Sequence, residues 1–340
     1  MHLKHPLLRL IKTQSEPPAQ DMTQDDFTLK KNFLRKIKIN LGKIIYPIKN
    51  FIEYRFVISK VLRLNVTESQ IRTPQLLTLG DRGFGRDILL NKISKIVGGI
   101  EIVACFGCGS GLELLDLAKY LKPKKIIAYD FFNYALGWEA ITKSLTNAGI
   151  EVIFIQHDIR LPLLVEEKAD LLISFEVLEH LSDISQILGN VKKILKEDGY
   201  FASTWGPLWY VYSGDHIAGE LGFSHGYDHL LLGSTEYEEW YRNHPRNKEW
   251  ISKGGVTWLE LGLISYAKYQ EYIDIIETLF GTTIWQAWCI SPKALKWHGL
   301  HPELWEKILT ANREIEPIDL ILQSVAIVSR PNINPGGVSV

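Results

Sequence analysis

Hydrophobic runs alternate with helical repeats along the chain from residue 99 onward. Short apolar runs, typical of buried strands, are followed by segments in which apolar residues recur every three or four positions, the spacing of one helix face. The runs predict seven strands over residues 100–106, 125–130, 151–156, 169–175, 199–205, 282–290 and 322–329. The repeats predict helices over residues 112–121, 134–148, 182–196 and 269–280. This alternation predicts an α/β fold, a Rossmann-like doubly wound sheet of about seven strands.

Two segments are longer than a minimal sheet requires. Residues 206–265 follow the fifth predicted strand, and residues 291–318 separate the last two strands. Ligands in doubly wound sheets bind beyond the carboxyl ends of the strands. We therefore expect a cap, inserted after the fifth strand, to cover a substrate site. The domain that carries it is expected over residues 64–331, followed by a short tail at 332–340.

The N-terminal 63 residues differ in charge from the rest of the chain. They carry 13 Lys and Arg against 5 Asp and Glu, a net charge of +8, whereas the whole 340-residue chain has −1. Residues 13–29 are polar and contain two consecutive prolines, which predicts a loop. Residues 30–63 alternate basic and apolar positions at helical spacing. This pattern predicts a helical extension packed on the domain or, alternatively, a peripheral contact with an anionic membrane.

Composition narrows the class of protein. Hydrophobic residues make up 46% of the chain and charged residues 23%, the proportions of a globular protein. A net charge of −1 argues against nucleic-acid binding by the chain as a whole. Three cysteines are too few for a disulfide framework, and no apolar run reaches about 18 residues. These features predict a soluble cytoplasmic protein and leave its oligomeric state open.

A glycine-rich loop joins the strand at residues 100–106 to the helix that follows. Its sequence, FGCGSG, places Gly107, Gly109 and Gly111 in a G-x-G-x-G spacing. Glycines let a chain turn tightly and approach a ligand closely, and a helix N-terminus favours negative charge. A dinucleotide fingerprint has its third glycine one position later, where Leu112 stands. The loop predicts a cofactor site, with a nicotinamide-dependent oxidoreductase as a less favoured alternative.

This loop and four later segments resemble the class I S-adenosylmethionine-dependent methyltransferases, in particular a bacterial branch that acts on small molecules and glycans. The segments follow the family's order within residues 99–207: FGCGSG, KIIAYD, QHDIRLPL, ADLLISFEVLEHLSD and KKILKEDGYFASTWGP. The resemblance implies S-adenosylmethionine as the cofactor. It also implies transfer of a methyl group to a small-molecule or glycan acceptor, which we expect to be methylated at oxygen.

The same resemblance implies which residues hold the cofactor. Asp130 would accept hydrogen bonds from the ribose hydroxyls, and Asp158 would face the adenine amino group. Cys105 stands where the family has an acid that contacts the methionine amino group, and a neutral thiol cannot stabilise an ammonium ion as a carboxylate does. This departure makes a catalytically silent, cofactor-binding scaffold protein the main alternative. The other expected cofactor contacts are Gly107, Gly109, Gly111, Phe131, Ile159, Phe175 and Glu176.

Histidines after the fifth strand are the candidates for acid–base chemistry. A general base assists transfer to a hydroxyl, and histidine titrates near neutral pH. Gly214-Asp215-His216 and His229-Leu230-Leu231 resemble the "G-H-H" and "H-L-L" strings of the bacterial branch, with Asp215 replacing the first histidine. His216 or His229 is therefore predicted as the catalytic base, with capping of a loop or helix as the alternative role. Nearby aromatic residues could stack on a sugar or aromatic ring: Trp205, Trp209, Tyr210 and Tyr212.

A second string raises the question of a metal. Glu176, Glu179 and His180 form E-x-x-E-H, which resembles the metal site of small-RNA 3′-end methyltransferases, with His216 or His229 as a further ligand. Two carboxylates and an imidazole could hold Mg²⁺ or Mn²⁺. The same string is common in metal-independent members of the wider family, where its residues contact the cofactor or begin the next helix. We therefore expect no metal.

Overall fold

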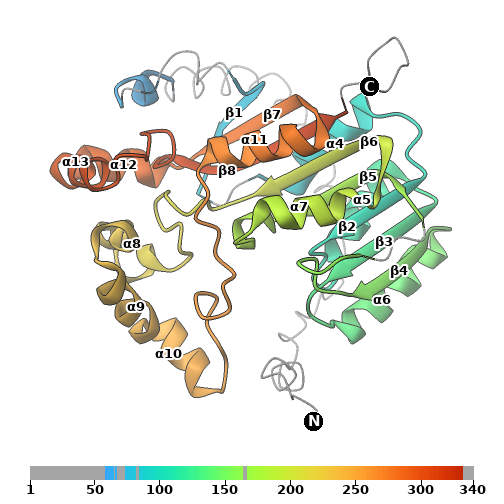
Figure 1. Ribbon diagram of the computed structural model, residues 1–340, viewed down its shortest axis with the longest axis horizontal. Helices are drawn as coiled ribbons and strands as arrows, with labels where there is room; N and C mark the ends of the chain where they lie inside the picture. The colour runs from blue at the N-terminus through green and yellow to red at the C-terminus, as the bar shows by residue number, and fades with distance from the viewer. Residues whose placement is uncertain (1–57, 65, 67–72, 82–83, 164–166, 332–340) are drawn as a thin grey trace, which may run out of the picture. The chain divides into compact units, whose positions relative to one another are not determined.

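The computed structural model describes residues 58–64, 66, 73–81, 84–163 and 167–331, which are coloured in Figure 1. The chain divides after Val61 into two compact units, and the fold described below belongs to the second, Leu62–Val340. The predicted loop at 13–29, most of the predicted basic helix at 30–63 and the tail at 332–340 lie outside the described residues. None of the helices in the described ranges has the length and hydrophobicity needed to cross a bilayer.

An eight-stranded sheet forms the centre of this unit. Its strands are β1 (Leu76–Leu79), β2 (Ile102–Phe106), β3 (Lys125–Asp130), β4 (Glu151–Gln156), β5 (Ala169–Phe175), β6 (Leu195–Trp205), β7 (Thr282–Ile290) and β8 (Leu322–Arg330). Their order across the sheet is β1-β7-β8-β6-β5-β2-β3-β4. All neighbouring pairs are parallel except those that β8 makes with β6 and β7. The carboxyl ends of all strands but β8 therefore lie at one edge of the sheet.

Helices cover both faces of the sheet. On one face α4 (Arg86–Ile96), α5 (Leu112–Leu121) and α6 (Ala135–Asn147) share a hydrophobic cluster with alternate residues of the strands. Two more helices, α7 (Ile184–Lys192) and α11 (Tyr269–Phe280), pack together in front of the sheet in Figure 1. There Phe280 stacks on Phe201 of β6, with 4.1 Å between the ring centroids. Because the central strands β2 and β5 are buried on both faces, their sequences are largely apolar.

The residues expected to form a cap fold into short helices. Between β6 and α11 lie η2 (Ala218–Leu221), η3 (Phe223–His225), α8 (Asp228–Leu231), α9 (Ser234–Asn243) and α10 (Pro245–Ser252). A small second core holds this part together: Trp209, Ile217, Tyr237, Tyr241 and Ile264. The segment between β7 and β8 contains α12 (Pro292–Leu300) and α13 (Pro302–Ala311). The two segments touch, since Trp297 of α12 donates from its indole N–H to the carbonyl of Ser224 over 3.1 Å.

The observed elements differ from the predicted ones in several places, including one strand and one helix end. The sheet has eight strands rather than about seven, because β1 precedes the region in which the pattern was regular. β1 has only four residues and pairs with β7, so that Leu76 lies opposite Ala287. The helix predicted over residues 182–196 ends at Lys192, after which β6 begins at Leu195. β6 thus begins four residues before the predicted strand at 199–205, and its register against β5 shifts between Leu195 and Tyr200.

Candidate functional site

The glycine loop lies at the end of β2, between the crossovers that lead to its neighbours β3 and β5. Such a point in a doubly wound sheet opens a crevice for ligands. Gly107 has a φ of +68°, and a Cβ there would lie 2.3 Å from Cγ2 of Val177. Gly109 has a φ of +51°, but no heavy atom of the described residues lies within 4 Å of its Cβ position. Gly111 is the N-cap of α5. The open space at Gly109 therefore leaves room for a ligand beside the N-terminus of this helix.

Asp130, at the end of β3, is bonded directly to this loop. Its Oδ2 accepts a hydrogen bond from the backbone N–H of Gly109 over 2.7 Å, and its Oδ1 accepts one from Phe132 over 2.9 Å. The residue is 8% exposed, and burial raises its pKa although the backbone donors act in the opposite direction. A carboxylate oxygen can accept more than one hydrogen bond. Asp130 therefore shapes the loop and retains acceptor capacity for hydroxyl groups.

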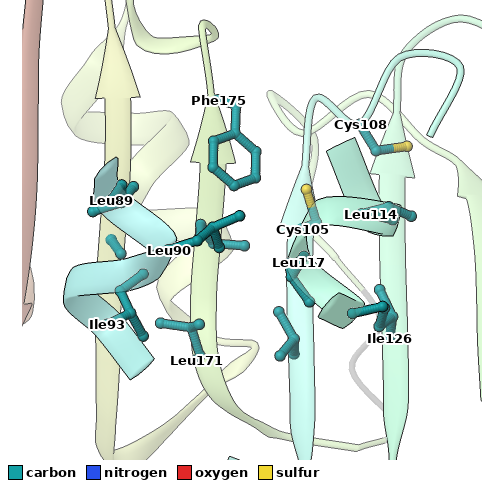
Figure 2. Close-up of a cluster of buried hydrophobic side chains, with 14 of the residues drawn as sticks. Leu89, Leu90, Ile93, Cys105, Cys108, Leu114, Leu117, Ile126, Leu171 and Phe175 are labelled. Atoms are coloured by element: carbon teal, nitrogen blue, oxygen red, sulfur yellow. The ribbon is translucent and has the colours of Figure 1, made fainter. Parts of the chain in front are cut away.

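Both cysteines of the loop region are buried as neutral thiols. Figure 2 shows Cys105 among the hydrophobic side chains between β2 and the helices on one face of the sheet, near Leu117. Burial raises the pKa of Cys105 well above its usual range and also raises that of Cys108. A carboxylate at position 105 would have to be desolvated in this cluster, whereas a thiol packs as a small apolar group. The role of Cys105 in cofactor binding stays a prediction.

The second acid, Asp158, forms a pair that the sequence did not predict. Arg160 donates from Nε to Oδ1 over 2.9 Å and from Nη2 to Oδ2 over 2.8 Å. Burial raises the pKa of Asp158, but these hydrogen bonds outweigh it and the pKa is lowered. The guanidinium of Arg160 also lies 5.2 Å from the ring centroid of Phe131. Ile159 stands between these two residues in the sequence and is buried. Its backbone carbonyl accepts a hydrogen bond from the side-chain amide of Asn190. Arg160 thus joins Asp158 and Phe131, two expected cofactor contacts.

The end of β5 carries a pair of acids. Phe175 is buried, whereas Glu176 is exposed to solvent and has a left-handed φ of +54°. Thr204 of β6 donates to Oε1 of Glu176 over 3.3 Å. Desolvation raises the pKa of Glu176 to about 7, and burial together with the charge of Glu176 raises that of Glu179 well above its usual range. Neither carboxyl oxygen of the buried Glu179 has a hydrogen-bond partner among the described residues.

Glu176, together with Glu179 and His180 of η1 (Leu178–His180), was considered above as a possible metal site. Within the described ranges, no group of three or more histidine, cysteine or carboxylate side chains is placed to hold a metal ion. His180 is instead occupied by protein contacts. Its Nδ1 lies 3.1 Å from the carbonyl of Leu263, and its ring stacks on His216 at 5.1 Å.

His216 connects this edge of the sheet to the cap. Its ring also meets Trp258, with 5.0 Å between centroids, and Trp258 meets His180 at 4.2 Å. His216 lines two cavities, one of about 440 Å³ within the cap and one of about 240 Å³ beside Pro207 and Lys293. Desolvation is the main cause that lowers the pKa of His216 to about 3, and the charges of His180 and Arg246 act in the same direction. The imidazole is therefore neutral at pH 7 and able to accept a proton.

His229 has a different environment. It is buried, and its Nε2 donates to the carbonyl of Trp209 over 2.8 Å. Its Nδ1 has no partner among the described residues, and desolvation lowers its pKa. Asp215, which directly precedes His216 in the sequence, is also buried and accepts a hydrogen bond from the backbone N–H of Ala218 over 2.7 Å. The structure therefore does not bring His229 and His216 together in one cavity wall.

The aromatic residues expected to stack on an acceptor are mostly packed inside the fold. Trp205, Trp209 and Tyr212 are buried. Tyr210 donates its hydroxyl to the carbonyl of Tyr266 over 3.0 Å. Trp258, which contacts both histidines, lies further along the chain, and helical or strand periodicity gives no signal for it because it stands in a turn.

Comparisons with known proteins concern the core of this site. Residues 104–203, from β2 to β6, match a family model described as methyltransferase domain. No curated protein matches the chain. The solved N-methyltransferase NodS from Bradyrhizobium japonicum, in complex with S-adenosylhomocysteine, is 15% identical with a TM-score of 0.40, over 73% of this chain and 86% of that one. An O-methyltransferase from a multienzyme of Brevibacillus brevis, with the same ligand, is 15% identical with a TM-score of 0.39, over 72% and 71%.

Proposed function

Because the chain contains a class I S-adenosylmethionine-dependent methyltransferase domain, we propose that it methylates an oxygen atom of a small-molecule or glycan acceptor. One observation carries this proposal. His216, a neutral imidazole, lines both a cavity in the cap and a cavity beside Pro207 at the end of β6. A proton acceptor between a cofactor-binding sheet edge and a cap cavity suits transfer to a hydroxyl group.

The residues of the glycine loop fit the cofactor. No heavy atom of the described residues lies within 4 Å of the Cβ position of Gly109, and Asp130 retains acceptor capacity for the ribose hydroxyls. Phe131 and Ile159, next to the two acids, would line the adenine, with Arg160 holding Asp158 in position. Phe175 and Glu176 would line the part nearest the acceptor. When bound, S-adenosylmethionine supplies an electrophilic methyl group on a sulfonium. With Cys105 neutral and buried, the methionine ammonium would depend on loop carbonyls or on Glu176.

Two side chains are candidates to take the acceptor's proton. His216 lines the cavities, whereas the Nε2 of His229 is engaged by Trp209, so we place the base at His216. A base with a pKa near 3 accepts a proton only as the new bond to oxygen forms, since it is too weak to remove one beforehand. Glu176, with a pKa of about 7, is the second candidate because its ionised form is the stronger base.

Cofactor binding is tested with Asp130→Asn. The amide keeps one oxygen acceptor but loses the charge, and hydrogen bonds to charged groups contribute about 1.5–3 kcal/mol each. We expect the Kd for S-adenosylhomocysteine, measured by titration calorimetry, to rise at least about tenfold. Asp274→Asn, on the outer surface of α11, is the matched control and should leave it unchanged. An unaltered Kd in Asp130→Asn contradicts the assigned site.

The base is tested with His216→Asn. We expect the Kd for S-adenosylhomocysteine to stay the same while kcat, on any acceptor found by screening glycosides and phenols, falls about 100-fold. His225→Asn serves as control, because His225 is exposed and paired with Asp228. Full turnover in His216→Asn, together with loss in Glu176→Gln, would move the base to Glu176.

A further inference from the structure

We propose that the 440 Å³ cavity in the cap binds an uncharged sugar ring, which stacks on the indoles of Trp250 and Trp258. The inference rests on the proposed methyl transfer, since it names the class of acceptor. The cavity lies within the usual range for small-molecule sites, roughly 300–1,000 Å³. His216 forms part of its wall, so a ring held there has the proposed base within the same cavity.

Two tryptophans give the cavity its shape. Trp250, in the last turn of α10, and Trp258, in the turn that follows, are each 42% exposed, although the cap offers a small core of its own. Large aromatic side chains left uncovered at one place mark a binding surface. The nonpolar C–H face of a pyranose packs against an indole face in this way.

Both indoles are held in fixed positions. The indole N–H of Trp250 donates to the carbonyl of Val256 over 3.1 Å. The glycine at position 255 lies directly against this ring, since a Cβ there would be 2.1 Å from its nitrogen. The ring of Trp258 is held by edge contacts with the rings of His180 and His216. A rigid platform binds a ring with little loss of side-chain entropy.

The charges around the cavity are paired, which favours an uncharged ligand. Arg246 donates to Glu220 over 3.0 Å, and Lys253 lies 2.6 Å from Glu249. The pairs leave little net charge to attract a phosphate or a carboxylate. They still offer N–H donors and carboxylate acceptors, and a sugar hydroxyl can use both. The charge of Arg246 acts on His216, which places this polar rim near the proposed base.

The test is saturation-transfer NMR on the full chain in the presence of S-adenosylhomocysteine. The probes are the methyl glycosides of glucose, galactose, mannose and rhamnose, with methyl glucuronide, glucose 1-phosphate and phenol as competing classes. We expect transfer to the ring protons of at least one neutral glycoside. Trp250→Ala should reduce the signal about fivefold or more, a loss of the size expected from removing one aromatic contact. Ile251→Ala, its 39% exposed neighbour outside the cavity lining, should not.

Each other outcome overturns the inference. These outcomes are no transfer to any glycoside, transfer that persists in Trp250→Ala, a stronger signal from the glucuronide or the sugar phosphate, and a signal from phenol alone. Binding of S-adenosylhomocysteine, measured on the same sample, separates this inference from the proposed function. If the cofactor analogue binds and the glycosides do not, only the sugar site is wrong. If the analogue does not bind, the proposed function itself fails.

Discussion

At the scale of single residues, Glu176 has an unusual backbone conformation. Its φ of +54° lies in a region that non-glycine residues rarely adopt. The backbone N–H of Glu176 donates to the carbonyl of Thr204 over 2.8 Å, and the Thr204 hydroxyl donates to its carboxylate. Two contacts from β6 thus hold the side chain in place at the end of β5. A strained residue held by its neighbours is typical of a functional site.

Replacing Glu176 with Gln should change how stability depends on pH. Desolvation raises the pKa of Glu176 from 4.5 to about 7, so the folded chain keeps a proton that the unfolded chain releases in this range. Wild-type stability therefore contains a contribution that is present below about 4.5 and lost as the pH rises through about 7. We expect the variant to gain stability relative to the wild type at pH 8 but not at pH 4.5, as measured by urea unfolding.

Solvent contact at Glu176 screens this effect, so its sign is the diagnostic quantity. Glu236→Gln, on the exposed side of α9, is the control variant for the loss of one carboxyl group. A Glu176→Gln difference that does not vary with pH would show that the carboxyl titrates as it does in the unfolded chain.

At the scale of elements, the turn from β2 to α5 depends on its first glycine. In Gly107→Ala the new Cβ would lie 2.3 Å from Val177, and the φ of +68° would be strained even without that contact. We expect the free energy of unfolding to fall by roughly 1–3 kcal/mol. Adding Val177→Ala should restore only part of this loss, because it removes the contact but not the backbone strain. Chemical denaturation measures both effects.

Gly98→Ala is the matched control for this turn. Gly98 has no heavy atom within 4 Å of its Cβ position among the described residues and lacks a positive φ. Its substitution should be close to neutral. Equal free energies of unfolding in Gly98→Ala and Gly107→Ala would mean that the turn tolerates a side chain at position 107, contrary to this prediction.

Local pattern predicts the central elements well and the connections between them less well. The helices at 112–121 and 269–280 begin and end as their spacing predicts, because each is bounded by a glycine. β1 could not be predicted in the same way. Its four residues carry no repeat, and it is a strand only because β7, about 210 positions later, supplies its partner.

The site residues also divide into those that local sequence patterns predict and those that depend on the tertiary fold. The glycine spacing and Asp130 are local signals, and the structure joins them by a direct hydrogen bond. The pairing of Arg160 with Asp158 could have been predicted, since the two residues are close neighbours in the sequence. The contact of Trp258 with His216 was not, because it depends on how the cap folds.

At the scale of the whole molecule, the direction of the strands explains why the site residues meet. Because every strand except β8 runs the same way, the ends of β2, β3, β5 and β6 lie at one edge of the sheet. The cap segments begin at that edge too, after β6 and after β7. The fold therefore gathers the glycine loop, the acids and the cap from segments that are far apart in the chain.

The position of β8 also has a consequence for biosynthesis. β8 follows all the other described strands in the sequence, yet it lies between β6 and β7 in the interior of the sheet. Until residues 322–330 emerge, the nascent chain holds two partial sheets, each ending in an unpaired apolar strand. Unpaired strand edges readily join other chains. The synthesis of β8 therefore completes the sheet, and a chain released before residue 322 is expected to be prone to aggregation.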